Sequence, residues 1–441
     1  MRALGIVWAC LWGFCLPGGL ALAAPVALVG GTVWTGEGAP IPNATVLIDG
    51  ETIVAVGPAG AMALPEGAAV VSTEGMTVLP GLVDLATQSW RLGHGDAARA
   101  DPILRPLAAR VVMPWVLGAE LAAGVTLAQE WESPFATALE LRRRVAEKRL
   151  NGPALLVASP VLERQAHAET NATGRQAVGS LAEATAFVRQ WIQDGADTIV
   201  VAAPEEWAPE DLQAIVALAH GAGRPVWAEL RWASGVAAAV NAGVDGLLGM
   251  GLDTAPDWPP EAVAAVQARV AAGGRLWWAP QLAPLATWRR WSADAEPLDS
   301  PAVFQALPVV LAQDLRASWT PYSRVVSPPY ASLRSLSAGA RIRALRAAGA
   351  TLVAGSGAGQ PALPHALALR EEIFALVHEA GLAPLEALRA GTLDAAAAVG
   401  RQVALAPGNR ADVIAVRGPV LEDIGALRDL AVVFAAGRRV K

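Results

Sequence analysis

An alternation of short apolar segments with helical stretches fills most of this sequence and most constrains its fold. Between residues 78 and 401, each segment of strand composition is followed by a loop and then by apolar residues at helical spacing, as in residues 209–222. A strand, loop and helix repeated in this order favour a parallel barrel enclosed by helices. Eight strands are expected, beginning near residues 78, 124, 152, 195, 225, 244, 275 and 350. We therefore predict the α/β class and a TIM-type (β/α)8 barrel.

Both ends of the chain show a different pattern, in which short strands alternate with turns. Five strand-like segments lie between residues 26 and 71, and two more lie at residues 412–416 and 431–435. Such spacing is typical of a small antiparallel sheet. We predict a β-sandwich built from residues 24–77 plus 402–441, beside a barrel of residues 78–401.

The first 23 residues have the composition of an export signal. Arg2 gives a positive start, residues 4–16 are apolar, and Ala21 to Ala23 form a small-residue cleavage site. We predict cleavage before Ala24 and a periplasmic or extracellular protein. The alternative is an uncleaved membrane anchor, although the apolar part is shorter than the roughly 20 residues that span a bilayer.

The composition argues against several kinds of partner and chemistry. A net charge of -6 provides no basic stripe for phosphates, so nucleic acid is not an expected partner. The long uncharged run at residues 351–369 is interrupted by Gly and Pro, so no membrane span is expected in the mature chain. Both cysteines, Cys10 and Cys15, lie within the predicted signal. The mature chain should therefore use no thiol catalysis, zinc–thiolate site or disulfide.

The stretch from Val78 to Trp90 reads VLPGLVDLATQSW. An apolar run leads into the turn Pro80-Gly81 and then into a short buried strand. This stretch resembles the first barrel strand of the amidohydrolase superfamily, which includes imidazolonepropionase-like enzymes and has a composite urease-alpha-like β-sandwich. Residues 29–33 and 405–412 resemble the two ends of that composite domain. The resemblance covers essentially the whole mature chain.

The resemblance implies a two-metal centre, and this sequence lacks the residues for it. The family holds its metals with a His pair on the first strand, a carbamylated Lys on the fourth, one His each on the fifth and sixth, and an Asp on the eighth. The matching positions carry Ala86, Gln88, Val200, Glu229, Gly249 and Gly357. Only Glu229 could still ligate a metal. The two lysines, Lys148 and Lys441, lie outside the predicted strands, so no shift of register restores the carbamate.

Without these ligands nothing retains a divalent ion at the strand ends, so we predict no metal cofactor. We predict a pseudoenzyme that binds a small molecule or pairs with an active amidohydrolase, with a homo-oligomer as the other possible assembly. The alternative is a hydrolase acting on C–N bonds, in non-peptide or dipeptide substrates, with a relocated metal such as zinc or with a carboxylate-based site.

Candidates for such a relocated or carboxylate-based site are few. His94 and Asp96 have the spacing of a chelating pair, and His167 lies in a loop that could cover the barrel mouth, although solvated loops explain both. Glu130 and Glu229 end the second and fifth predicted strands, and a two-carboxylate mechanism would need such a pair at a defined separation. In the other interpretation, the two carboxylates face water or pair with arginines.

The three remaining candidates favour structural roles. Ser356 lies between glycines without a nucleophile elbow or a visible base, which argues against an esterase. His220 is expected to cap a helix end, where an imidazole satisfies the last carbonyls. His365 begins a helix, in a stretch that resembles a structural His of the family.

Tryptophan is unusually frequent, with 16 residues against two Tyr and six Phe. Several tryptophans follow predicted strand ends with polar residues between them. The predicted ligand-binding residues are Gln88, Trp90, Trp131, Trp227, Glu229, Arg231 and Gln281. Indole buries a large apolar area and keeps one donor, which suits a ligand pocket. In the other interpretation, the indoles fill the volume left by the absent metals.

Overall fold

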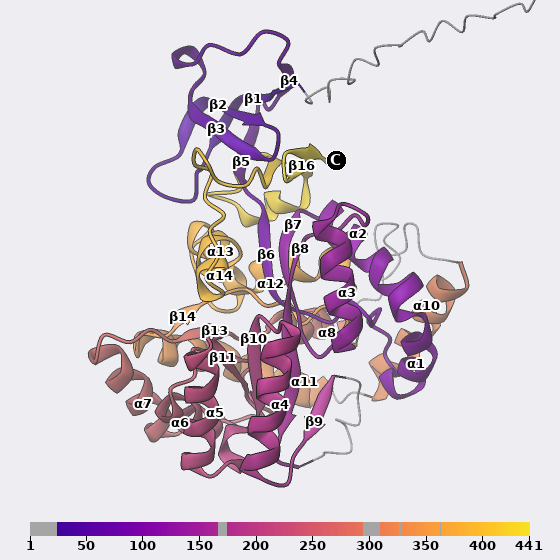
Figure 1. The fold of residues 1–441 in the computed structure, drawn as a ribbon, viewed down its shortest axis with the longest axis vertical. Helices are drawn as coiled ribbons and strands as arrows, with labels where there is room; N and C mark the ends of the chain where they lie inside the picture. Colours follow the sequence, from indigo (N-terminus) through magenta and orange to yellow (C-terminus); the bar gives the residue numbers. More distant parts are fainter. Residues whose placement is uncertain (1–23, 166–173, 294–308, 326–327, 362) are drawn as a thin grey trace, which may run out of the picture.

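The computed structural model describes residues 24–165, 174–293, 309–325, 328–361 and 363–441. The predicted export signal and His167 lie outside these ranges, so the structure does not test either prediction. Figure 1 shows the two parts of the chain, a small sheet that contains both ends of the described chain and a larger barrel with helices around it. None of the helices in the described ranges is long and apolar enough to cross a membrane.

Eight parallel strands form the barrel and follow one another in sequence order. They are β6 (Leu82–Thr87), β7 (Val125–Glu130), β8 (Ala154–Glu163), β10 (Thr198–Ala202), β11 (Val226–Glu229), β12 (Gly246–Leu248), β13 (Trp277–Ala279) and β14 (Thr351–Leu352). Backbone hydrogen bonds join β6 to the segment beginning at β14, because Leu85 N donates to Ala354 O (3.2 Å) and Gly357 N donates to Ala86 O (2.8 Å). The predicted TIM-type barrel is confirmed.

Helices cover the outside of the barrel. They are α1 (Ala97–Leu104), α2 (Met113–Ala122), α3 (Phe135–Ala146), α4 (Leu181–Asp194), α5 (Pro209–Gly221), α6 (Gly235–Ala242), α7 (Pro260–Ala271), α8 (Ala283–Ala293), α10 (Val309–Val325), α11 (Pro328–Ala347), α12 (His365–His378), α13 (Pro384–Ala390) and α14 (Leu393–Ala398). Local sequence sets their ends. For α4, the Ser180 side chain accepts from Glu183 N, and Gly195 ends the helix in the left-handed conformation.

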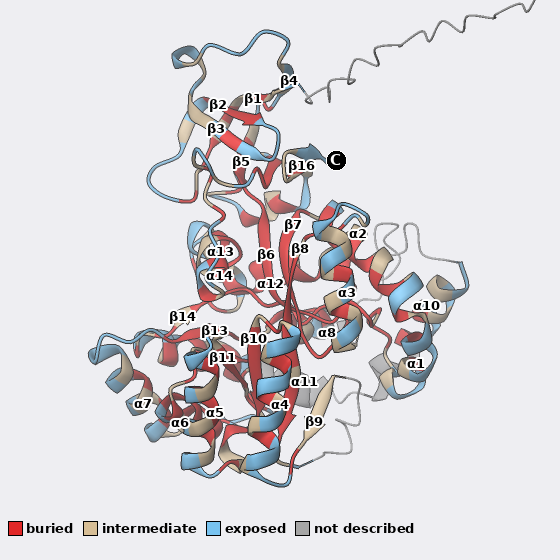
Figure 2. Cartoon of the chain, viewed as in Figure 1, coloured by how far each residue is buried: buried red, intermediate tan, exposed pale blue. Residues whose placement is uncertain are grey.

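Apolar side chains pack on both faces of the barrel strands, as the period of two along a strand requires. On β10, Ile199 and Val201 pack toward the helices, whereas Val200 packs inside the barrel. Trp131 and Trp227 meet edge to face in the interior, with ring centroids 6.4 Å apart. Figure 2 shows the strands buried along their length and the helices exposed on their outer faces. The barrel interior is therefore a packed core.

The second sheet combines strands from both ends of the chain. Its members are β1 (Val26–Val33), β2 (Ile41–Asp49), β3 (Thr52–Pro58), β4 (Ala69–Ser72), β5 (Met76–Pro80), β15 (Val413–Arg417), β16 (Leu430–Ala435) and β17 (Arg438–Arg439). Strand β15 pairs antiparallel with β5 and so joins the two ends. Leu28, Val46, Val78, Val413 and Phe434 lie in one buried apolar cluster beneath it. The predicted composite, sandwich-like sheet is confirmed.

Candidate functional site

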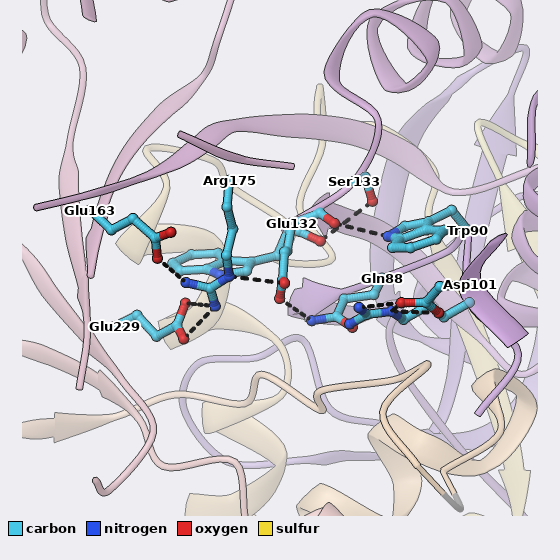
Figure 3. Close-up of polar contacts among 10 residues, drawn as sticks. Gln88, Trp90, Asp101, Glu132, Ser133, Glu163, Arg175 and Glu229 are labelled. Atoms are coloured by element: carbon cyan, nitrogen blue, oxygen red, sulfur yellow. Dashed lines mark hydrogen bonds and ion pairs between the residues drawn. The ribbon is translucent and has the colours of Figure 1, made fainter. Parts of the chain in front are cut away.

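An arginine lies among three carboxylates at the C-terminal ends of the barrel strands, where barrels of this type place their chemistry (Figure 3). Arg175 begins the short strand β9 (Arg175–Ala177), which pairs in parallel with the end of β8. Its Nη2 lies 2.7 and 2.9 Å from the two carboxylate oxygens of Glu229. Its Nε lies 3.0 Å from Glu132, and its Nη1 lies 3.4 Å from Glu163. We call these four residues the Arg175 cluster.

A glycine allows this arrangement. Gly174 has a φ of +94°, and a Cβ added to it would lie 2.5 Å from the carbonyl carbon of Glu132. Only glycine combines this backbone conformation with so close an approach. Glu132 itself has a φ of 50°, which is uncommon for a residue with a side chain and is a form of strain that gathers at functional sites. The backbone is therefore shaped to bring Arg175 against Glu132.

The Arg175 guanidinium is almost fully buried, with 8% of the side chain exposed. Burial by itself lowers the pKa of Arg175, but the charges of Glu229 and Glu132 outweigh it, so the pKa lies above its ordinary value. The side chain remains a cation, and carboxylates face each of its nitrogens. An anionic ligand would have to displace one of them.

Hydrogen bonds extend the cluster toward the end of β6. The Gln88 amide donates through Nε2 to Glu132 Oε2 (2.9 Å) and accepts through Oε1 from Arg91 Nη1 (2.9 Å). Arg91 in turn pairs with Asp101 at 2.7 Å. Trp90 Nε1 donates to the backbone oxygen of Glu132 at 2.9 Å. Gln88 thus lies between two ion pairs, with both ends of its amide engaged.

A cavity of about 280 Å³ opens beside the cluster, at the ends of β11, β12 and β13. Its polar side chains are Glu229, Gln281 and Gln360, and its remaining walls are apolar or glycine. Gln281 has a φ of 56°, a second strained backbone position at this end of the barrel. A Cβ added to Gly249 would lie 3.9 Å from its nearest neighbours, so this position leaves space. The cavity is small for a ligand pocket but has a few polar groups on apolar walls.

The structure divides the predicted ligand-binding residues into two groups. Glu229 and Gln281 line the cavity, and Gln88 lies in the adjoining hydrogen-bond network. Trp90, Trp131 and Trp227 are each at most 2% exposed and are among the largest fully buried side chains. Arg231 is half-buried in the loop after β11. The positions of the three tryptophans fit the interpretation in which indoles fill interior volume, rather than that of an aromatic pocket.

Several solved structures with a similar architecture are hydrolases. A Xaa-Pro dipeptidase with bound methionine matches with 20% identity and a TM-score of 0.72, over 94% of this chain and 99% of that chain. A. niger ochratoxinase matches with 20% identity and a TM-score of 0.69 over 95% and 96%, and molinate hydrolase with 20% and 0.70 over 95% of each chain. The chain shares the fold of these proteins and of a protein named as an amidohydrolase, which matches with 18% identity and a TM-score of 0.69 over 94% and 98%. No protein-family model matches the sequence, and no curated protein matches it.

The positions that the resemblance to the amidohydrolase superfamily assigns to metal ligands do not fit a metal pair here. Ala86 and Val200 are buried in the barrel interior and have no donor atoms. A Cβ added to Gly357 would lie 2.8 Å from Nε2 of Gln360 and 3.2 Å from Nε2 of Gln281. Two neutral amides thus occupy the space of the eighth-strand Asp. With Glu229 engaged by Arg175 at both oxygens, the donor set for a divalent ion is absent from these positions.

The described candidates for a relocated metal, His94 and Asp96, have other partners. Asp96 caps α1 by accepting from Arg99 N at 3.1 Å, and His94 Nε2 lies 3.3 Å from Asp314. Across the part of the chain that the structure describes, no three His, Cys, Asp or Glu side chains form a group that could hold a metal. His220 differs from its predicted capping role, because its Nε2 lies 2.8 Å from the side chain of Asp245.

Two buried carboxyl groups on the barrel strands, Asp84 of β6 and Glu130 of β7, have raised pKa values. Asp84 accepts from Ser356 Oγ (2.5 Å) and Ser356 N (2.9 Å), and burial raises the pKa of Asp84 to about 6. Glu130 accepts from Ser133 Oγ at 2.5 Å, and burial raises its pKa to about 7. Neither residue lines the mouth cavity. Glu130 and Glu229 thus belong to separate hydrogen-bonded groups, and the contacts show no catalytic pair between them.

A buried ion pair lies behind β6. His365 Nδ1 is 2.8 Å from Glu120 Oε1, and His365 Nε2 is 2.8 Å from the backbone oxygen of Arg91. The backbone oxygen of Arg91 can only accept, so Nε2 of His365 carries a proton. Burial lowers the pKa of His365, but the hydrogen bond and charge of Glu120 outweigh it and raise the pKa above its ordinary value. The predicted structural role of His365 agrees with these contacts.

Sequence reasoning missed Arg175, Glu132 and Glu163 as site residues. The third predicted strand begins near residue 152, and its counterpart β8 is a long strand that continues to Glu163. The apolar pair Val161-Leu162 after Pro160 is the sequence signal that the strand continues toward Glu163. Nothing in the spacing identifies Arg175, because its place depends on the pairing of β9 with β8.

Proposed function

We propose that this chain is a metal-independent protein of the amidohydrolase fold that binds a small molecule at the barrel mouth. One observation carries the proposal, namely the two-pronged contact of Arg175 with Glu229. Glu229 is the only family metal position that still has a ligand side chain, and its partner is an internal cation. Bidentate arginine–carboxylate pairs are strong and geometrically specific. The guanidinium thus supplies the positive charge that a metal supplies in the family, but has no site for activating water.

The cavity next to the cluster indicates the class of ligand. One carboxylate and two amides project from apolar walls, and these groups suit a ligand with amide or amine donors and an apolar part. A volume of about 280 Å³ limits the ligand to a small molecule. We expect Gln281→Ala and Glu229→Gln to weaken binding, because each removes an acceptor.

A second candidate is a hydrolase of C–N bonds that uses carboxyl groups, and the comparisons favour this one. The neighbours named above are a dipeptidase, an ochratoxinase and a hydrolase of molinate. Glu130, whose pKa is raised to about 7, is in the range suited to a general acid or base near neutral pH. Its burial outside the mouth cavity counts against direct contact with a substrate.

One assay separates the two candidates. Xaa-Pro dipeptides and N-acyl amino acids are incubated with the purified chain in EDTA and, separately, with added zinc, and Glu130→Gln and Glu229→Gln are measured alongside. If the chain is a binding protein, the wild type gives no more turnover than these variants, either in EDTA or with added zinc. Turnover in EDTA that disappears in Glu130→Gln would establish the carboxylate hydrolase instead. Zinc-dependent turnover would contradict the metal-independent proposal.

We propose further that the chain is exported and cleaved before Ala24. The support is the arrangement of Arg2, the apolar residues 4–16 and the small residues Ala21 and Ala23. N-terminal sequencing of the secreted or periplasmic protein is expected to begin at Ala24. Replacing Ala21 and Ala23 by leucine is expected to leave an uncleaved precursor, whereas Ala39→Leu, at an exposed position beyond the site, should leave cleavage unchanged. Recovery of residues 1–23 on the mature chain would contradict this prediction.

A further inference from the structure

A second and larger cavity lies at the opposite end of the barrel from the mouth. Its volume is about 940 Å³, and its walls include Leu82 and Val125, the first residues of β6 and β7. Helices α2 and α12 and the chain near β16 complete it. Figure 1 shows α2 close to the terminal sheet, where the two parts of the chain meet. This cavity shares no lining residue with the mouth cavity.

The charge of the lining is opposite to that of the whole chain. The charged side chains along the cavity are Lys148, Arg149, Arg370, Arg428 and Lys441, and neither Asp nor Glu is among the lining residues. The chain as a whole has 40 acidic and 34 basic side chains, and both of its lysines are in this lining. Positive charge concentrated in one hollow favours an anionic ligand.

Two of these cations, Lys148 and Arg149, have partners that are easily exchanged. Lys148 pairs with Glu51, and Arg149 pairs with Glu147, but in both pairs each side chain is at least 46% exposed. Exposed pairs of this kind contribute on the order of 0–1 kcal/mol. An anion in the cavity can therefore compete for Lys148 and Arg149 at little cost.

Apart from Asn151 and His365, the remainder of the lining is apolar or glycine, so the cavity suits an amphipathic molecule. Trp115 of α2 is half-buried there, and Leu369, Leu427 and Leu430 lie along the walls. Contact with such side chains stabilises an apolar body by about 25 cal/mol per Å² removed from water. A bare inorganic anion would leave these walls uncovered.

We propose that this cavity binds an organic anion with an apolar body, of the class of a medium-chain carboxylate. The cations hold the carboxylate, and Trp115 with the leucines covers the chain. The site is independent of the proposed function of the mouth, because the two cavities have no residue in common.

Calorimetric titration of the full chain tests the proposal with three probes. Decanoate is expected to bind, decanol at least about tenfold more weakly, and inorganic phosphate not at all. The double variant Lys148→Gln/Arg428→Gln, in which both sites are exposed, should weaken decanoate about tenfold. The control Arg417→Gln removes an exposed charge outside the cavity and should leave the affinity unchanged. Thermal melting checks that the variants fold.

Three results would overturn the proposal. Equal binding of decanol and decanoate would show that charge has no role. Binding of phosphate as tight as that of decanoate would show that the apolar wall has none. Unchanged decanoate affinity in both the double variant and Trp115→Ala would place the ligand elsewhere.

Discussion

Replacing Arg175 by methionine is expected to lower the free energy of unfolding by about 3–5 kcal/mol. The substitution keeps an apolar stem but leaves the carboxylates of Glu132, Glu163 and Glu229 facing one another without their cation. Breaking a buried pair from one side costs far more than the pair contributes, because the remaining charges have lost their solvent. Urea unfolding followed by tryptophan fluorescence measures the change.

Two further variants make this test specific. Arg417→Met removes an arginine of similar size from an exposed pair with Asp429 and is expected to cost less than about 1 kcal/mol. Adding Glu229→Gln to Arg175→Met should recover part of the loss, because it removes one of the unpaired charges. A cost for Arg175→Met as small as that for Arg417→Met would show that the cluster does not hold the barrel mouth together.

Stability is expected to decrease as pH rises from about 4 to about 7, opposite to the usual behaviour of carboxylates. The pKa of Asp84 is raised from 3.8 to about 6, and that of Glu130 from 4.5 to about 7. The folded state therefore holds these protons where the unfolded chain has released them. The stability that each proton provides is complete below the unfolded pKa and is lost as pH rises through the folded pKa. Each group accounts for roughly 3 kcal/mol, at about 1.36 kcal/mol per pKa unit.

Unfolding measured at a series of pH values with two isosteric variants tests this dependence. Asp84→Asn should remove the decrease between about pH 4 and 6, and Glu130→Gln the decrease between about pH 4.5 and 7. The raised pKa of His365 acts in the same direction at higher pH, because its charged form is lost as pH rises through the folded value. Stability that rises through this range, equally in the wild type and both variants, would contradict the assigned acidities.

The barrel was predictable because its strands are marked by composition. Apolar runs such as residues 198–202 are buried on both faces, and they alternate with helical spacing such as that of Pro209–Gly221. The strand β9 was not predictable, because three residues of mixed polarity carry no strand signal. Its pairing depends on Gly174 passing close to Glu132, which is a contact between distant parts of the sequence.

The sequence predicts which positions lack metal ligands but not which side chains lie there instead. The side chains of Ala86 and Val200 have no donor atoms in any fold, so this prediction needs no coordinates. Which side chains fill the space of the metal ligands depends on contacts between distant parts of the sequence. Arg175 comes from a strand after β8, and the amides of Gln281 and Gln360 come from loops after β13 and β14. The high number of tryptophans indicated large aromatic side chains at the strand ends, but it did not distinguish a ligand pocket from interior packing.

The metal content of the purified chain tests most directly whether Arg175 has replaced a metal centre. The chain is incubated with excess zinc or manganese, desalted, and measured by inductively coupled plasma mass spectrometry. If Arg175 and its carboxylates hold the barrel mouth together in place of a metal, we expect less than about 0.1 equivalent of retained metal per chain. Retention of about one equivalent or more, lost in Glu229→Gln, would contradict it.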